Sequence, residues 1–168
     1  AHEIPSRIYQ GRDVHGVLAK TEPHLLFTED EEAQGRAGLE ELGLGDDAKF
    51  ICILGRDSLY LESTDAKRDW HYHNFRDIDI QSFLLAAEEL TRRGYHVVRM
   101  GSLVKEEFKT SNPMIIDYAS REPSDFMDIY LTANCRFFMS CGTGLDGVAN
   151  AFRKPVAFVS FVPMDWGY

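Results

Sequence analysis

A glycine-rich segment is the first place in this sequence where ligand chemistry is expected. It reads Ser140-Cys141-Gly142-Thr143-Gly144-Leu145-Asp146-Gly147 and contains the spacing Gly142-x-Gly144-x-x-Gly147. Glycines let the backbone approach a ligand closely, and open N–H groups at a helix start attract phosphate. Because the segment lies between an apolar run and a helical pattern, it favours phosphate binding; a tight turn with glycine for packing is the alternative. Asp146 would bind a sugar or ribose hydroxyl or cap its helix.

Two other functions of this segment fit less well. A dinucleotide fingerprint expects an acid at the end of the next strand, about 20 residues on. That strand ends at Ser160-Phe161, and the nearest acid, Asp165, lies beyond Pro163. A cysteine phosphatase loop needs an arginine where Gly147 follows Cys141. An NAD(P)-dependent oxidoreductase is therefore only an alternative, and we expect a buried, unreactive thiol.

A second candidate, Gly55-Arg56-Asp57-Ser58, follows the apolar run 50–54. An arginine fixed at the mouth of a strand can hold a diphosphate through two hydrogen bonds, as lysine cannot. Asp57 would orient that arginine or hold a hydroxyl group. The alternative is a surface Arg–Asp pair, which contributes little.

Other polar residues are weaker candidates. His71 and His73 lack a third ligand, so they do not predict a metal site. A loop that closes over a ligand through His73 and Asn74, or that caps the next helix through Asp77, is favoured instead. Arg99 and Gly101 end another apolar run and would contact a base or a ribose. We expect no metal and no cofactor.

The candidate segments lie between predicted strands and helices that alternate along the chain. We expect strands at 50–54, 95–100, 114–118, 135–139 and 156–161, a long polar loop at 56–77, and helices at 29–44, 79–93, 124–134 and 145–152. Short strand–helix connections predict a doubly wound, Rossmann-like parallel α/β sheet. In such sheets ligands bind beyond the carboxyl ends of the strands, where the candidate segments lie.

The composition narrows the function classes. The chain has 168 residues and a net charge of −9, with eight acids but only Arg36 as a base between residues 29 and 47. It has no basic patch for nucleic acid and no apolar run that would form a transmembrane segment. Cys52, Cys135 and Cys141 lack metal-site spacing and indicate reduced thiols in a cytoplasmic protein.

The chain divides unevenly. Residues 1–28 contain Pro5 and Pro23 and read as a linker or incoming arm, and residues 29–168 as one nucleotide-binding domain. The sequence has neither an initiator Met nor a signal stretch, and it ends abruptly at Tyr168. We therefore expect it to be part of a longer two-domain protein.

Several motifs in order resemble one known family. They are Gly55-Arg56-Asp57-Ser58-x-Tyr60-Leu61, His73-Asn74-Phe75-Arg76-Asp77-x-Asp79-Ile80, Gly94-Tyr95-x-Val97-Val98-Arg99-Met100-Gly101, Cys135-Arg136-Phe137-Phe138, Gly142-Thr143-Gly144-Leu145-Asp146 and Arg153-Lys154-Pro155-Val156. Together, over about residues 27–163, they resemble bacterial glycosyltransferases encoded among surface-polysaccharide genes.

The resemblance implies the GT-B architecture of two Rossmann-like domains, with this chain as the C-terminal, donor-binding half. It implies a nucleotide-sugar donor, a carbohydrate or lipid-linked acceptor, an N-terminal acceptor domain missing here, and a cytoplasmic site, peripheral at the inner membrane face. Arg56 is similar to the arginine that grips the donor diphosphate in fucosyltransferases of related fold. Gly55 departs from the pattern, where a larger residue such as valine is expected.

The implied mechanism is metal-independent transfer. Arg56 and the N–H groups of residues 142–146 would stabilise the departing nucleoside diphosphate, which is electrostatic catalysis. The general base would come from the missing domain. A non-catalytic nucleotide-binding module is the other alternative.

Overall fold

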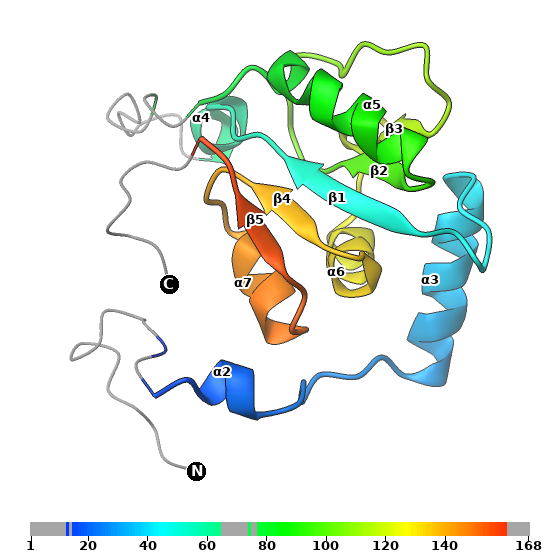
Figure 1. The fold of residues 1–168 in the computed structure, drawn as a ribbon, viewed down its shortest axis with the longest axis vertical. Coiled ribbons are helices and arrows are strands. Elements are labelled where there is room, and N and C mark those ends of the chain that lie inside the picture. Colours follow the sequence, from blue (N-terminus) through cyan, green and yellow to red (C-terminus); the bar gives the residue numbers. More distant parts are fainter. Residues whose placement is uncertain (1–12, 14, 65–73, 75–76, 161–168) are drawn as a thin grey trace.

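A five-stranded parallel sheet forms the centre of the computed structural model, which describes residues 13, 15–64, 74 and 77–160 (Figure 1). The strands are β1 (Phe50–Leu54), β2 (His96–Arg99), β3 (Ile115–Asp117), β4 (Phe138–Ser140) and β5 (Val156–Phe158). Their order is β3-β2-β1-β4-β5, and every neighbouring pair is parallel. The predicted Rossmann-like α/β fold is confirmed.

Helices cover both faces of the sheet. One face packs against α3 (Glu29–Glu41), α6 (Asp125–Asn134) and α7 (Leu145–Ala151), and the other against the 3-10 turn η2 (Ile80–Phe83) and α5 (Leu84–Arg92). Figure 1 shows α5 above the sheet and α6 and α7 below it. Successive residues of β1 point to opposite faces, so Cys52 joins the first core and Ile53 the second.

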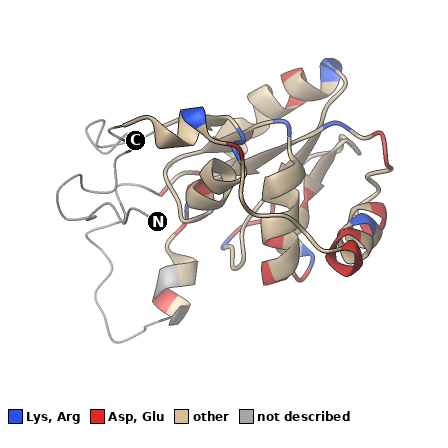
Figure 2. Cartoon of the chain, turned by 90° about the horizontal axis from the view of Figure 1, so that it is seen from below, with Lys and Arg blue, Asp and Glu red and all other residues tan. Residues whose placement is uncertain are grey.

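The ends of two helices follow from side-chain capping. Thr28 and Glu31 form a reciprocal capping box at the start of α3, and Gly43, with φ of 79°, follows its end. Ser124 accepts a hydrogen bond from the backbone N–H of Met127 and begins α6. Both starts are as predicted. Figure 2 shows the positions of the acidic residues of α3 in red.

Two elements differ from the sequence-based expectation. The region expected as a loop from residue 56 contains α4 (Leu59–Thr64), because the Asp57 carboxylate caps the Leu59 amide. The strand expected from residue 135 begins at Phe138, because the Cys135 amide still donates to the α6 carbonyl of Leu131. β1 has the predicted bounds, and β2, β3 and β5 are each shorter than predicted by two or three residues.

The end of the expected N-terminal arm contacts the domain. After α2 (Val17–Lys20), the Phe27 ring stacks on Phe152 at 5.4 Å and packs against Tyr130 at 5.0 Å. Arg153 donates hydrogen bonds to the carbonyl and the hydroxyl of Thr21 at 3.0 and 2.9 Å. These contacts fix residues 21–27 on α6 and α7. Within the described ranges, no helix has the length and hydropathy to cross a bilayer.

Candidate functional site

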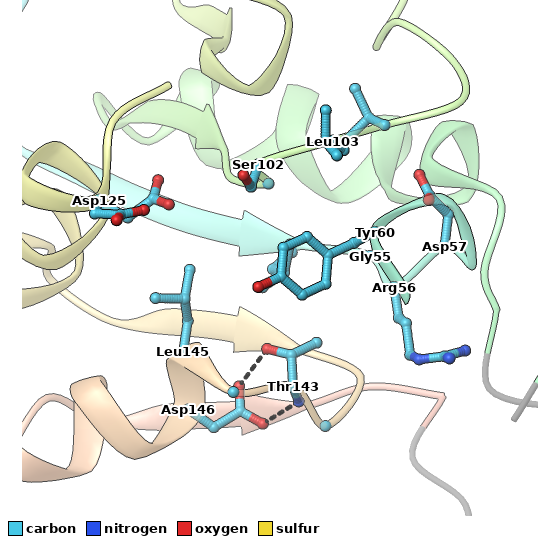
Figure 3. Close-up of a pocket in the computed structure, with 16 residues that line it drawn as sticks. Gly55, Arg56, Asp57, Tyr60, Ser102, Leu103, Asp125, Thr143, Leu145 and Asp146 are labelled. Atoms are coloured by element: carbon cyan, nitrogen blue, oxygen red, sulfur yellow. Dashed lines mark hydrogen bonds between the residues drawn. The ribbon is translucent and has the colours of Figure 1, made fainter. Parts of the chain in front are cut away.

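A cavity of about 560 Å³ opens at the carboxyl ends of β1 and β4. From β1 the chain builds β2 and β3 on one side and then returns to place β4 and β5 on the other, so this is the point where the strand order reverses. Segments 54–60, 101–104 and 142–146 line the cavity, together with Asp125 and Asp128 from the first turn of α6. This cavity is called the cleft below, and Figure 3 shows it.

Arg56 lies at the rim of the cleft in a fixed position. Its side chain is 10% exposed, and its Nη1 donates to the carboxylate of Asp77. Its backbone N–H donates to Sγ of Cys141, and its carbonyl accepts from the Ile78 amide at 2.9 Å. Burial raises the pKa of Asp77, and the charge of Arg56 opposes that shift. The guanidinium is thus held by an acid beside the cleft.

The structure explains why glycine stands at position 55, where the resemblance predicts a larger residue such as valine. A Cβ at this position would lie 2.8 Å from Cγ2 of Ile78 and 3.3 Å from Cδ1 of Ile80. A valine would therefore collide with the segment that enters η2. The backbone before Arg56 is fixed by this close approach rather than by a larger side chain.

Asp57 ties two cleft loops together. Its Oδ1 accepts from the Leu59 amide at 2.9 Å, and its Oδ2 accepts from the Lys105 amide at 3.1 Å. The Lys105 ammonium also donates to the hydroxyl of the buried Ser58. These bonds join the end of β1 to the loop after β2. The expected contacts of Asp57 with Arg56 or with a ligand hydroxyl stay predictions.

The glycine-rich turn satisfies part of its own hydrogen bonding. Ser140 accepts from the Gly142 amide at 3.2 Å, and Asp146, which is 1% exposed, accepts from the Thr143 amide at 2.6 Å. Asp146 therefore bonds back to the turn before α7, and the helix cap expected of it is not formed, because the N-cap residue is Gly144, which has no side chain to cap the helix. Its contact with a ligand hydroxyl stays a prediction. The amides of Gly144 and Leu145 have no acceptor among the described residues of this turn.

The glycines of the turn have different roles. Gly142 has φ of 89°, a conformation that favours glycine. A Cβ at Gly144 or Gly147 would meet nothing within 4 Å. The third glycine of a dinucleotide fingerprint serves close helix–strand packing, and Gly147 does not. Open space at Gly144, which lines the cleft, is instead compatible with a ligand that approaches the backbone.

Arg99 and Gly101 lie differently at the end of β2. Arg99 is 2% exposed, and its Nη1 donates to Asp117 at 2.9 Å and to the Glu106 carbonyl at 3.1 Å. This burial favours a structural role, and the base or ribose contact expected of Arg99 stays a prediction. Gly101 does line the cleft, and with φ of 147° its missing Cβ leaves room for Val104.

The histidine loop is described only in part. His71 and His73 lie outside the described residues. Asn74 is exposed, and its carbonyl accepts from the Asp77 amide at 3.0 Å. Asn74 is not part of the cleft lining. In the ranges that the structure describes, no three His, Cys, Asp or Glu side chains are grouped so as to hold a metal ion.

None of the three cysteines forms a disulfide, and all three are buried. Cys52 lies in β1 as expected, whereas Cys135, expected in a strand at 135–139, ends α6. Cys141 follows β4. Burial raises the pKa of the Cys52 thiol well above its usual value. The expected lack of reactivity of Cys141 stays a prediction.

Four cleft features were not predicted from the sequence. Tyr60 is 51% exposed on α4, and Leu103 is 47% exposed after β2; both line the cleft. Asp125 and Asp128 line it from α6. In the sequence these acids are ordinary residues of a first helical turn. Only the position of α6 beside the β1–β4 edge brings them to the cleft.

Asp128 is the most unusual of these residues. Its Oδ1 is buried and, in the part of the chain that the structure describes, has no hydrogen-bond partner. Burial, with a smaller contribution from the negative charge of Asp125, raises the pKa of Asp128 to about 6, and the Tyr118 hydroxyl opposes the shift. An ionised carboxylate at this position is therefore poorly compensated by the protein itself.

No protein-family model, curated protein or solved structure matches this chain. The class is therefore defined by the structure: a Rossmann-like α/β protein with a ligand-sized cleft where the strand order reverses.

Proposed function

We propose that this chain is the donor-binding half of a glycosyltransferase. The cleft binds the nucleoside diphosphate of a nucleotide-sugar, and the sugar passes to a carbohydrate or lipid-linked acceptor held by a further, N-terminal domain. The observation that carries the proposal is the position of Arg56 at the end of β1, across the reversal point from the glycine-rich turn. The setting would be cytoplasmic, at the inner membrane face.

The chemistry needs stabilisation of a leaving group. As the bond between the anomeric carbon and the phosphate oxygen breaks, negative charge grows on the diphosphate. Arg56 would donate to that charge, and the amides of Gly144 and Leu145 are suitably open. The acceptor oxygen forms the new bond, and its proton goes to a base of the acceptor domain. No metal is required.

The Arg56–Asp77 ion pair is compatible with this role. A guanidinium carries five N–H donors, so a pair with one carboxylate does not exhaust it. Asp77 would hold the side chain in one rotamer before the ligand arrives, which reduces the entropy lost on binding. Asp77 is then a positioning residue.

One observation favours a second candidate, a non-catalytic nucleotide-binding module. The amides of Gly142 and Thr143 already donate to Ser140 and Asp146, which leaves fewer donors for phosphate than a complete phosphate loop has. Such a module would bind nucleotide without transfer. An oxidoreductase is disfavoured, because Gly147 lacks the packing role of the dinucleotide fingerprint.

The first test is a thermal-shift panel. The protein is melted with UDP, GDP, CMP, dTDP, ADP, NAD and S-adenosylmethionine, each with and without Mg²⁺. A ligand that binds only the folded state raises the melting temperature. We expect one nucleoside diphosphate to do so equally with and without the metal. A cooperative melt that no nucleotide shifts would contradict the proposal, and a shift by NAD alone would favour the oxidoreductase.

A further inference from the structure

The α6 wall of the cleft has the opposite charge from the Arg56 rim. Asp125 and Asp128 lie one helical turn apart in the first turn of α6 and both line the cleft. Figure 3 shows Asp125 and Arg56 on opposite sides of the cleft. Neither acid has an ion-pair partner among the residues that the structure describes. Asp57 and Asp146 line the cleft as well, but their carboxylates accept hydrogen bonds from backbone amides.

One oxygen of the partly buried Asp128 carboxylate, Oδ1, is enclosed and receives no hydrogen bond from any residue that the structure describes. The neighbouring Tyr118 hydroxyl is already engaged: it accepts from the Ser124 amide at 2.9 Å and donates to the Ser124 carbonyl at 3.2 Å. A carboxylate oxygen without a hydrogen bond in a cavity lowers the stability of the fold. A ligand with donor groups would form the missing hydrogen bond and so gain binding free energy.

The acidic side of the cleft, formed by α6, disfavours the phosphates of a nucleotide and favours its nucleoside part. A carboxylate repels phosphate, so a diphosphate would not lie against α6. It accepts hydrogen bonds from hydroxyl and N–H groups, which a nucleoside carries on its ribose and its base. Tyr60 and Leu103 are half exposed at the cleft and offer an apolar surface to a planar ring.

We propose that Asp128, assisted by Asp125, is the specificity residue that accepts hydrogen bonds from the nucleoside part of the ligand. The inference rests on the proposed function: the diphosphate lies at Arg56 and the nucleoside reaches across the cleft to α6. The donor groups are either the ribose hydroxyls or the N–H edge of the base. Guanine presents adjacent N–H donors, whereas uracil flanks its single N–H with two carbonyls that a carboxylate repels.

Isothermal titration calorimetry tests this. The wild-type chain and the Asp128→Asn variant are titrated with GDP, UDP, 2′-deoxy-GDP and inorganic pyrophosphate. Asp46→Asn, which removes an exposed acid after α3, is the charge-matched control. We expect Asp128→Asn to weaken the preferred nucleoside diphosphate about tenfold and to leave pyrophosphate binding and the control unchanged.

Comparison of the nucleotides shows whether the ribose or the base donates the hydrogen bonds to Asp128. A loss with GDP that is absent with 2′-deoxy-GDP assigns the ribose, and a loss with GDP that is absent with UDP assigns the base. Unchanged nucleotide affinity in Asp128→Asn, or equal losses for GDP and pyrophosphate, would overturn the inference while the proposed function stands. A wild-type chain that binds neither nucleotide nor pyrophosphate would overturn the proposed function itself.

Discussion

The backbone N–H of Arg56 donates a hydrogen bond to Sγ of Cys141, at 3.1 Å and across 85 residues of sequence. Arg56 follows β1 and Cys141 follows β4, so the bond joins the two loops that meet at the reversal of strand order. The buried thiol thus contributes to the site by holding the backbone of Arg56.

Removal of the Arg56 side chain tests the phosphate site. We expect Arg56→Ala to weaken nucleoside diphosphate binding by roughly 10- to 150-fold, since a hydrogen bond to a charged group contributes about 1.5–3 kcal/mol. Arg56→Lys keeps the charge but cannot form two parallel hydrogen bonds, so its nucleoside diphosphate affinity should lie between those of the wild type and Arg56→Ala. Arg36→Ala, at an exposed position on α3, is the control. Calorimetry measures all four proteins; equal affinities would remove Arg56 from the site.

Alanine variants of Gly144 and Gly147 distinguish an effect on ligand binding from an effect on stability. A methyl group at either Gly144 or Gly147 has open space, and at Gly147, inside α7, alanine favours the helix by up to about 1 kcal/mol. We expect neither Gly144→Ala nor Gly147→Ala to lower the melting temperature. Only Gly144 lines the cleft, so only Gly144→Ala should reduce nucleotide affinity. Equal affinities of the two variants would place the ligand away from this turn.

The raised pKa of Asp128 predicts a pH-dependent stability difference. The folded-state pKa is about 6, against an ordinary value of 3.8, so the ionised carboxylate destabilises the fold above pH 6, and this penalty disappears as the pH falls from 6 to 4. Tyr118 and Asp125 are the titratable neighbours. Allowing for solvent screening, we expect Asp128→Asn to melt about 2–4 °C above the wild type at pH 7.5.

That difference should shrink steadily in melts at lower pH. A merely structural carboxylate would give the reverse, because its replacement would lower the melting temperature at pH 7.5. Higher stability together with weaker nucleotide binding is the combination expected of a residue kept for function.

Arg99 provides a contrast with Arg56. Its buried pair with Asp117 also orders the backbone near Glu106 and Phe108. Loss of one partner leaves a poorly compensated buried charge, so Arg99→Ala should destabilise the fold by about 3–5 kcal/mol in urea unfolding. Arg99→Lys keeps the charge and should fold, and its nucleotide affinity then decides the role. Weakened binding in that folded variant would restore the ribose or base contact.

The parallel fold was predictable because its signals are local. The apolar run at β1 and the Thr28 and Ser124 caps each act within a few residues. The cleft segments after β1 and β4 were also predictable, since carboxyl ends of parallel strands share an edge. The place of Asp128 in the cleft was not predictable, because it depends on how α6 packs beside the β1–β4 edge of the sheet. The Arg56–Asp77 pair was missed because the partners are 21 residues apart.

The central position of β1 has a consequence for folding kinetics. Its pairing with β4, in which Cys52 lies opposite Phe138, must close a far longer loop than its pairing with β2. Long-range pairing of this kind is slow, so we expect the β1–β4 seam to form late. The cleft lies at that seam and would exist only after the transition state. A bound nucleotide should then slow unfolding while the refolding rate stays the same.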